Sequence, residues 1–371
     1  MSLENWAPKK LNELGFIGRG KSKHRPRNAP FLYGGNYPFV QTGDIKSAEL
    51  YVRNYSQTYS EQGLAQSKLW RPDTLCITIA ANIAETAILG IEACFPDSIV
   101  GFVADPEKAD VRFVKYYIDT IKLHMQNISR GTTQDNLSLE KLLTFDILTP
   151  PLPIQRKIAA VLSAYDDLIE VNTRRICLLE EMAQAVYREW FGSLDAASLP
   201  EGWEVGPLED ALVLQRGFDL PKRDRKEGNV PIFASTGIAG FHNEVKVKAP
   251  GVVTGRSGSL GTVIYVEDDY WPLNTTLWVR EFRRVTPIYA YYLLKEMDFS
   301  QFNSGAAVPT LNRNDVHGLP VIIPSQDILA KFDEFVLPLY DFRRNLTEKN
   351  ANLRRTRDLL LPRLVSGEVE V

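Results

Sequence analysis

The chain contains two long helical patterns, and each follows a segment rich in short β patterns. The first pattern begins after Pro150 ("PPLPIQRKIAAVLSAYDDLIEVN"), and the second begins at Pro324 ("PSQDILAKFDEFVLPLYDFRRN"). At 1.5 Å per residue, each helix extends about 50 Å, which is longer than one small domain can cover. Part of each apolar stripe therefore needs another partner, and we expect the two helices to pack on each other as a coiled coil.

The two halves of the chain form an internal repeat. "ENWAPKKLNELGFIGRG" from Glu4 aligns without gaps with "EGWEVGPLEDALVLQRG" from Glu201, at an offset of 197 residues. "SRGTTQDNLSLEKLLTFDILTP" from Ser129 aligns with "NSGAAVPTLNRNDVHGLPVIIP" from Asn303, at an offset of 174 residues. The common order of the matches indicates duplication, and the smaller second offset predicts shorter loops in the second copy.

Each copy predicts a globular part followed by a helix. β-rich runs such as "TLCITIA", "GVVTG", "GTVIYV" and "TTLWVR" lie between turn residues, and helical patterns cover Val111–Met125 and Pro287–Met297. The predicted class is α+β, with two globular mixed α/β domains separated by two long helices packed as an antiparallel coiled coil, and a pseudo-two-fold internal repeat. The predicted domain boundaries are 1–150, 151–195, 196–324 and 325–371.

One apolar stripe is predicted along each helix, and Asn172 and Asn350 interrupt it. A polar residue in such a seam can fix the register, and a solvated position is an equal alternative. We expect Pro338 to kink or break the second helix and Pro362 to end it. The stripes are predicted at Ile154, Ile158, Val161, Leu162, Tyr165, Leu168, Ile169, Ile176, Leu179, Ala183, Val186 and Trp190, and at Ile328, Phe332, Phe335, Val336, Leu339, Phe342, Leu346, Leu353 and Leu360.

Charge does not decide the direction of the helix pair. An antiparallel pair brings Glu180 and Glu181 to Arg343 and Arg344. A parallel pair brings Glu180 to Arg354 and Glu170 to Arg344, and an exposed ion pair contributes at most about 1 kcal/mol. Topology favours the antiparallel arrangement, because two repeats related by a pseudo-two-fold axis place one domain at each end of the pair.

Composition excludes several classes of protein. The 371 residues carry a net charge of −3, so a nucleic-acid partner depends on local patches rather than on the overall balance. Three separated cysteines fit neither a disulfide framework nor a zinc site, which indicates a reducing, cytoplasmic setting. We find no apolar run of membrane-spanning length, no apolar signal region, no phosphate-binding loop and no metal-ligand spacing among the histidines.

Basic loops follow the first strand pattern of each copy. "RGKSKHRPRN" (Arg19–Asn28) has five Lys and Arg residues and no acidic residue, and "RGFDLPKRDRKEG" (Arg216–Gly228) has five Lys and Arg residues and three acidic residues. Such loops suit contacts to DNA phosphates, and arginine can also read guanine. The predicted DNA-binding residues here are Arg19, Lys21, Lys23, Arg25, Arg27, Arg216, Lys222, Arg223 and Arg225.

A second type of loop is small and polar. "TGRSGSLG" (Thr254–Gly261) contains glycines that allow close backbone approach to phosphate. "SRGTTQDN" (Ser129–Asn136) and "NSGAAVPTLNRN" (Asn303–Asn314) occupy matching repeat positions, and ordinary turns are an equal alternative. The predicted contacts are Arg130, Thr132, Thr133, Gln134, Arg256, Ser257, Ser259 and Arg313, and no catalytic or metal-binding residue is predicted.

The helical blocks "PLPIQRKIAAVLSAYDDLIEVN" and "RRTRDLLLPRLVSGEVEV", with the domain opening "LPEGWEVGPLEDALVLQRG", resemble those of type I restriction-modification specificity subunits. This resemblance covers nearly the whole chain. It implies a non-catalytic subunit whose two target recognition domains read a bipartite, asymmetric site in double-stranded DNA. The helices would fix the spacing of the half-sites, and their exposed polar residues would face the partners.

The resemblance also implies the other components of a complex. Two methyltransferase subunits would dock and bring S-adenosylmethionine, so that this chain would bind no cofactor itself. Motor-nuclease restriction subunits would join them, and no membrane would be involved. Two alternatives stay open: a stand-alone DNA-cleaving enzyme, and a protein scaffold whose basic loops hold acidic partners.

Overall fold

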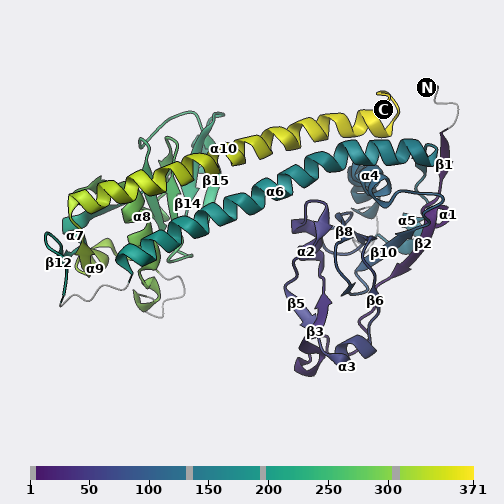
Figure 1. Cartoon of the computed structure of the whole chain (residues 1–371), viewed down its shortest axis with the longest axis horizontal. Coiled ribbons are helices and arrows are strands. Elements are labelled where there is room, and N and C mark those ends of the chain that lie inside the picture. Colours follow the sequence, from purple (N-terminus) through teal and green to yellow (C-terminus); the bar gives the residue numbers. More distant parts are fainter. Residues whose placement is uncertain (1–5, 131–136, 193–197, 303–309) are drawn as a thin grey trace. The chain divides into compact units, whose positions relative to one another are not determined.

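A computed structural model describes residues 6–130, 137–192, 198–302 and 310–371. The chain divides into two compact units: Met1–Arg174 with Leu346–Val371, and Arg175–Asn345. The two long helices are α6 (Leu152–Phe191) and α10 (Gln326–Val365), and each helix contributes one part to each unit (Figure 1).

The first unit contains two main sheets. The larger sheet has the strand order β2-β10-β7-β8-β4, and α4 (Val111–Arg130) packs against β7 and β8. The second sheet has the order β5-β3-β9-β6, and β1 pairs with β11. The strands are β1 (Ala7–Lys9), β2 (Gly15–Arg19), β3 (Tyr33–Phe39), β4 (Tyr51–Val52), β5 (Gln57–Tyr59), β6 (Leu69–Trp70), β7 (Thr74–Thr78), β8 (Thr86–Leu89), β9 (Ala93–Cys94), β10 (Ile99–Ala104) and β11 (Ile147–Thr149). The short helices are α1 (Leu11–Leu14), α2 (Thr42–Ser47), α3 (Glu61–Ala65), α5 (Leu139–Leu142) and the 3-10 turn η2 (Pro30–Leu32).

The second unit repeats this plan with fewer strands. Its larger sheet has the order β13-β19-β16-β17, its second sheet has the order β15-β14-β18, and β12 pairs with β20. The strands are β12 (Glu204–Pro207), β13 (Leu212–Arg216), β14 (Val230–Ala234), β15 (Gly237–His242), β16 (Gly251–Gly255), β17 (Val263–Val266), β18 (Trp271–Pro272), β19 (Thr276–Phe282) and β20 (Pro320–Ile323). The helices are α7 (Leu208–Ala211), α8 (Pro287–Glu296), α9 (Arg313–His317) and the 3-10 turns η3 (Lys222–Asp224) and η4 (Phe299–Phe302).

The strand pairing confirms the internal repeat. In both units the first long strand pairs with the last strand of the larger sheet, and that last strand also pairs with the first strand of a hairpin. In the second sheet of each unit, an inner strand has one antiparallel and one parallel neighbour. This strand is β3 in the first unit and β14 in the second. The two units share this strand pairing although their loops differ in length. Duplication of one ancestral unit therefore accounts for the similarity of their folds.

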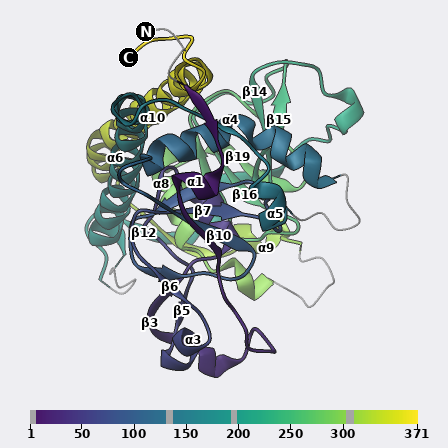
Figure 2. The same cartoon turned by 90° about the vertical axis from the view of Figure 1, so that its right-hand side faces the viewer.

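The long helices pack antiparallel in each unit, as predicted. In the first unit, Asp166 of α6 contacts Arg357 of α10, and Asn172 contacts Asn350, so the numbers rise on one helix as they fall on the other. The α6 and α10 ribbons run side by side in both views (Figure 1, Figure 2). The ends of the helices enter the cores of the two units, for example through Leu162 and Leu364 in the first unit and through Tyr187 and Phe332 in the second.

The second unit shows the same direction with one of the predicted ion pairs. Arg343 Nη1 lies 2.9 Å from Glu180 Oε1, as the antiparallel scheme requires. Arg344 instead pairs with Asp268, at 2.8 Å, and Arg354 of the first unit pairs with Glu49. Two of the arginines assigned to the helix seam therefore bind the globular parts.

The prediction of a single apolar stripe per helix is wrong. Val161 and Leu168 of α6 are 39% and 36% exposed, and Phe335 and Phe342 of α10 are 50% and 49% exposed. Each helix carries apolar residues on two faces, and the partner helix and the globular core cover only one of them. Spacing by three and four residues does not separate two adjacent stripes.

The predicted break at Pro338 and the predicted end of the helix at Pro362 are also wrong, whereas a kink at Pro338 stays a prediction. Helix α10 continues without a break through Pro338 and ends at Val365, three residues beyond Pro362. Pro338 and Glu334 are exposed, so water can bind the carbonyl that loses its helical hydrogen bond. Pro362 lies in the last turn of the helix, where few further backbone hydrogen bonds depend on it.

Candidate nucleic-acid interface

The first basic loop is held in place by its arginines. Arg19, at the end of β2, donates from Nη2 to the carbonyl oxygen of Asp97 at 2.8 Å, and Arg27 pairs with the Asp97 carboxylate at 2.8 Å. Arg25 donates to the carbonyl oxygens of Ser22 and His24 within its own loop, at 2.6 and 2.8 Å. Lys21 and Lys23 are exposed, and neither ammonium group forms an ion pair within the part of the chain that the structure describes, so they are the cations of this loop that are available for phosphate.

An aromatic platform lies beside this loop. The Lys68 ammonium is 3.6 Å from the centre of the Trp70 ring and 4.6 Å from that of Phe16, and Phe16 is 56% exposed. Burial lowers the pKa of Lys68, and the nearby Lys21 lowers it further, so the two ammonium groups share one positive region. Sequence reasoning missed Lys68 and Phe16, because neither belongs to a run of basic residues.

The second basic loop follows β13 and has acidic neighbours. Arg216 lies 3.7 Å from Asp219, and Arg223 lies 3.7 Å from Asp224. Arg225 donates to the carbonyl oxygen of Ala239 at 2.9 Å, which fastens the loop to β15. Lys222 is exposed. The second loop therefore presents weaker net positive charge than the first.

The structure brings two of the predicted loop segments together in the second unit. The backbone of Ser257 bridges to Thr310, and Leu311 N–H donates to the carbonyl oxygen of Arg256 at 2.8 Å. Gly258 and Gly261 have φ values of +89° and +81°, a region that disfavours other residues. The half-buried Arg256 donates to the carbonyl oxygen of Asn274 at 3.3 Å, while Ser257 and Ser259 are half-buried and Arg313, at the start of α9, is exposed.

The first unit has a matching loop that sequence reasoning missed, Ile79–Ala84 between β7 and β8. Leu137 N–H donates to the carbonyl oxygen of Ile79 at 2.9 Å, which is the equivalent of the Leu311 contact. Ala81 and Ala84 have φ values of +52° and +60°, at the repeat positions of Gly258 and Gly261. The loops share a backbone shape, but the first has no cation: its exposed polar side chain is Asn82. No glycine marks it, so only the fold reveals the match.

Part of the predicted site falls in segments that the structure does not describe. Thr132, Thr133 and Gln134 lie outside the described residues, as do residues 303–309 of the matching segment. Arg130 is the last residue of α4, and its side chain also lies outside the description. The DNA contacts of all the predicted site residues stay a prediction.

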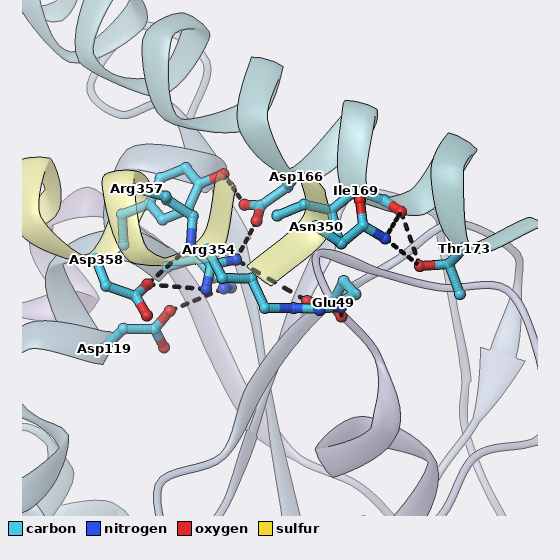
Figure 3. Close-up of polar contacts among 11 residues, drawn as sticks. Glu49, Asp119, Asp166, Ile169, Thr173, Asn350, Arg354, Arg357 and Asp358 are labelled. Atoms are coloured by element: carbon cyan, nitrogen blue, oxygen red, sulfur yellow. Dashed lines mark hydrogen bonds and ion pairs between the residues drawn. The ribbon is translucent and has the colours of Figure 1, made fainter. Parts of the chain in front are cut away.

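Polar contacts join α6 and α10 to the globular part of the first unit (Figure 3). The fully buried Asp166 carboxylate accepts from Tyr116 of α4 and pairs with Arg357 of α10. Burial, and then the Asp166 charge, raises the pKa of Tyr116, so its hydroxyl remains a donor. Asn350 Nδ2 also donates to Thr173 Oγ1 at 3.2 Å.

The described residues contain no group of three or more His, Cys, Asp or Glu side chains that could hold a metal ion. No helix within the described ranges is both long enough and apolar enough to cross a membrane.

Comparison with known proteins identifies the family. Residues 3–181 and 200–348 match the model of the type I restriction modification DNA specificity domain. The chain therefore belongs to the type I restriction-modification DNA specificity family and contains two copies of its domain. The resemblance found in the sequence is confirmed, and the family does not favour the stand-alone nuclease or the scaffold.

Two curated relatives extend over almost the whole chain. The type I restriction enzyme MjaIX specificity subunit of Methanocaldococcus jannaschii is 26% identical over 99% of this chain and 94% of its own length. The HindI specificity subunit of Haemophilus influenzae is 21% identical over 96% of this chain and 98% of its own length. The crystal structure of the S subunit from M. genitalium has a TM-score of 0.65 at 19% identity, covering 97% and 96% of the two chains, and shows the same fold.

Proposed function

We propose that the chain reads a two-part, asymmetric site in double-stranded DNA, with one recognition domain on each half. The main observation that supports this proposal is the pair of matching loops, one in each unit. In the second unit this loop carries Arg256 and two serines. The matching loop of the first unit, Ile79–Ala84, connects the equivalent strands and contains no cation. Arginine and asparagine prefer guanine and adenine respectively, so two such loops suit unlike half-sites.

The basic loops support a role in phosphate binding. Lys21 and Lys23 lie exposed on a loop that Arg19, Arg25 and Arg27 hold in shape. A cation that is free in the protein can neutralise a phosphate and release a counterion, whereas an arginine already bound to a carboxylate gains less. We assign the phosphate contacts of the first domain mainly to the lysines.

We propose that the long helices set the distance between the half-sites and dock two methyltransferase subunits. The docking face would be the outward apolar residues rather than the polar ones that the sequence suggested. Val161, Leu168 and Val171 of the first unit are between 36% and 47% exposed, and Leu178 and Met182 of the second are 48% and 51% exposed. Exposed apolar residues repeated along one helix are typical of a surface that another helix covers.

The remaining components follow from membership of a restriction-modification family. We propose that the partner methyltransferase binds S-adenosylmethionine and performs the chemistry, while this chain supplies recognition without catalysis. Motor-nuclease subunits would join to form the restricting complex, in the cytoplasm. The two unlike loops support the recognition role of this chain.

The test is methylation mapping. The chain is expressed with its cognate methyltransferase subunit in a host that lacks DNA methylation, and methyladenine is located by sequencing. We expect one motif with two unlike halves separated by unread positions. An unsplit motif would overturn the two-domain proposal, and assembled subunits without a motif would favour the scaffold. DNA cleavage by the purified chain with a divalent metal would favour the nuclease.

A further inference from the structure

The buried seam between α6 and α10 contains two polar layers in the first unit. In one layer, Asn172 Nδ2 donates to Asn350 Oδ1 at 2.9 Å, and both residues are almost fully buried, at 1% and 3% exposure. Asn350 Nδ2 donates in turn to the Ile169 carbonyl oxygen at 3.3 Å. In the other layer, Arg357 pairs with the buried Asp166 (Figure 3).

The repeat does not reproduce these layers. The helices are of equal length and start 174 residues apart. At this offset Asn172 corresponds to Leu346, and Asn350 corresponds to Ile176. Leu346 is buried, and both counterparts are apolar. The two helices are therefore equivalent in position within the repeat, but the buried asparagines of one layer are replaced by apolar residues in the equivalent layer.

The charged layer is asymmetric in the same way. Asp166 corresponds to Tyr340, and Arg357 corresponds to Ala183. Tyr340 and Ala183 are 4% and 0% exposed, and Tyr340 hydrogen-bonds to Tyr292 rather than to a charge. Two layers thus pair polar groups across the seam only when one helix is α6 and the other is α10.

Like-with-like pairing between two chains would leave Asn172 without the Asn350 amide and would leave Asp166 with the Tyr116 hydroxyl but without its charged partner. Because the helices are pseudo-equivalent, α6 could pack antiparallel on α6 of a second chain through the same apolar residues. Asn172 would then face Ile176 and Asp166 would face Ala183, each twice. A buried polar group without a partner lowers the population of such a pairing, on the order of tenfold for each group.

We propose that Asn172–Asn350 and Asp166–Arg357 select the pairing of α6 with α10 and reject like-with-like pairing between two copies of this chain. A single buried asparagine is known to specify register and partner in coiled coils at a cost in stability. The consequence rests on the proposed function: pairing α6 with α10 joins two unlike recognition domains, whereas α6 with α6 would join two identical ones.

The test uses the full chain without DNA, so it can fail independently of the proposed function. Asn172→Leu with Asn350→Ile makes the layer identical to its counterpart. Wild type and variant are refolded from urea at high chain concentration, and the dimer fraction is measured by sedimentation velocity. We expect the thermal midpoint of the variant to be unchanged or raised, and its dimer fraction to rise at least about tenfold. Arg175→Ala, at an exposed position, is the control.

The exposed Cys177 of α6 distinguishes the kind of dimer, since Cys76 and Cys94 are buried. In an α6–α6 pair, Cys177 lies at the same level along the helix axis as Val171 of the other chain. Spin labels on the two Cys177 residues would then lie within about 30 Å, and the dipolar coupling between labels reports this distance. A dimer fraction equal to that of wild type, or dimers without the short distance, would overturn the proposal.

A second variant adds asparagines to the seam instead of removing them. Ile176→Asn with Leu346→Asn gives every like-with-like pair an asparagine partner while Asn172 and Asn350 are retained. We expect this variant also to form dimers with the short Cys177 distance. If both variants remain monomeric, or if the first does not fold and the second shows no short distance, the apolar cores alone select the pairing and the proposal is wrong.

Discussion

The guanidinium of Arg357 on α10 forms an ion pair with the carboxylate of Asp166 on α6, whose side chain has no solvent exposure. Tyr116 of α4 donates to the same carboxylate, so one buried charge ties three helices together. Within the first unit this contact links the long-helix seam to the globular part. Several properties of the chain depend on such contacts and can be measured.

Removing Arg357 leaves the Asp166 charge buried with only the Tyr116 hydroxyl as a partner. We expect Arg357→Ala to lower the free energy of unfolding by about 3–5 kcal/mol, measured by urea denaturation. Arg355→Ala, two residues away at an exposed position, should change it by less than about 0.5 kcal/mol. A loss for Arg357→Ala no larger than for this control would show that the pair is solvated rather than buried.

Stability should fall in mild acid because of His317. Its side chain is 8% exposed, and its Nε2 accepts from Leu214 N–H at 2.9 Å, which requires the neutral ring. Burial lowers the pKa of His317; Glu209 raises it, and Arg313 and Arg283 lower it. The folded pKa lies below the unfolded value of about 6.5, so the contribution is complete above that pH and is lost as pH falls through the folded value.

The measurement is urea denaturation of wild type and His317→Gln at pH 7.5 and 5.5. Glutamine keeps an acceptor but does not titrate. We expect the loss of stability between these pH values to be smaller in the variant than in wild type. Equal losses in the two proteins would assign the acid sensitivity to other groups.

Lys21 and Lys23 should contribute to affinity without contributing to sequence preference. We expect Lys21→Ala with Lys23→Ala to weaken DNA binding by the assembled complex on all sequences. The slope of log K against log salt should decrease by about 2, because each phosphate contact contributes about 0.9. Lys331→Ala, at an exposed position on α10, should leave the slope unchanged. An unchanged slope in the double variant would remove this loop from the interface.

Arg256 should instead affect specificity. Arg256→Ala is expected to weaken binding to the methylated motif by about 1–3 kcal/mol and to relax one base preference in the second half-site. Fluorescence anisotropy with specific and random duplexes separates the two effects. Arg280→Ala, an exposed arginine of β19, is the matched control. A loss under about 0.3 kcal/mol would mean that Arg256 only supports the loop through Asn274.

The outward face of α6 can be tested by adding a charge. Val171 is 47% exposed, so Val171→Glu should leave the thermal midpoint of the isolated chain nearly unchanged. We expect it to reduce methyltransferase association at least about tenfold, because a docked helix would bury the carboxylate without a partner. Leu123→Glu, on α4 at 74% exposure, should bind normally. Normal binding by both variants would exclude this face as the docking surface.

Direction and pairing of the helices were only partly predictable from local patterns. Acidic and basic residues on α6 and α10 fit either direction, and the topology of the repeat rather than charge predicted the antiparallel pair. Arg344 and Arg354 bind Asp268 and Glu49, which lie 76 and 305 residues away in the chain. Helical periodicity carries no information on partners at that distance.

The match between the two loops was also only partly predictable from local sequence patterns. The glycines of Thr254–Gly261 predicted close backbone approach to phosphate, with an ordinary turn as the alternative, and the structure has left-handed glycines at Gly258 and Gly261. The matching loop, Ile79–Ala84, has alanines at two of the left-handed positions and no local signal. Only the alignment of strands β7 and β8 with β16 and β17 relates the two loops, and strand pairing is a long-range property.

The sequence by itself determined the duplication, the two long helices, the main strands and the basic loops. Each of these is encoded by periodicity or composition within a short stretch of chain. Only the tertiary structure decided which apolar face of each helix is buried, that Asn172 and Asn350 bond to each other, and that Lys68 lies over Phe16 and Trp70. The physical reason is that burial and polar pairing depend on what lies opposite a side chain, and the opposite residue comes from a distant part of the chain.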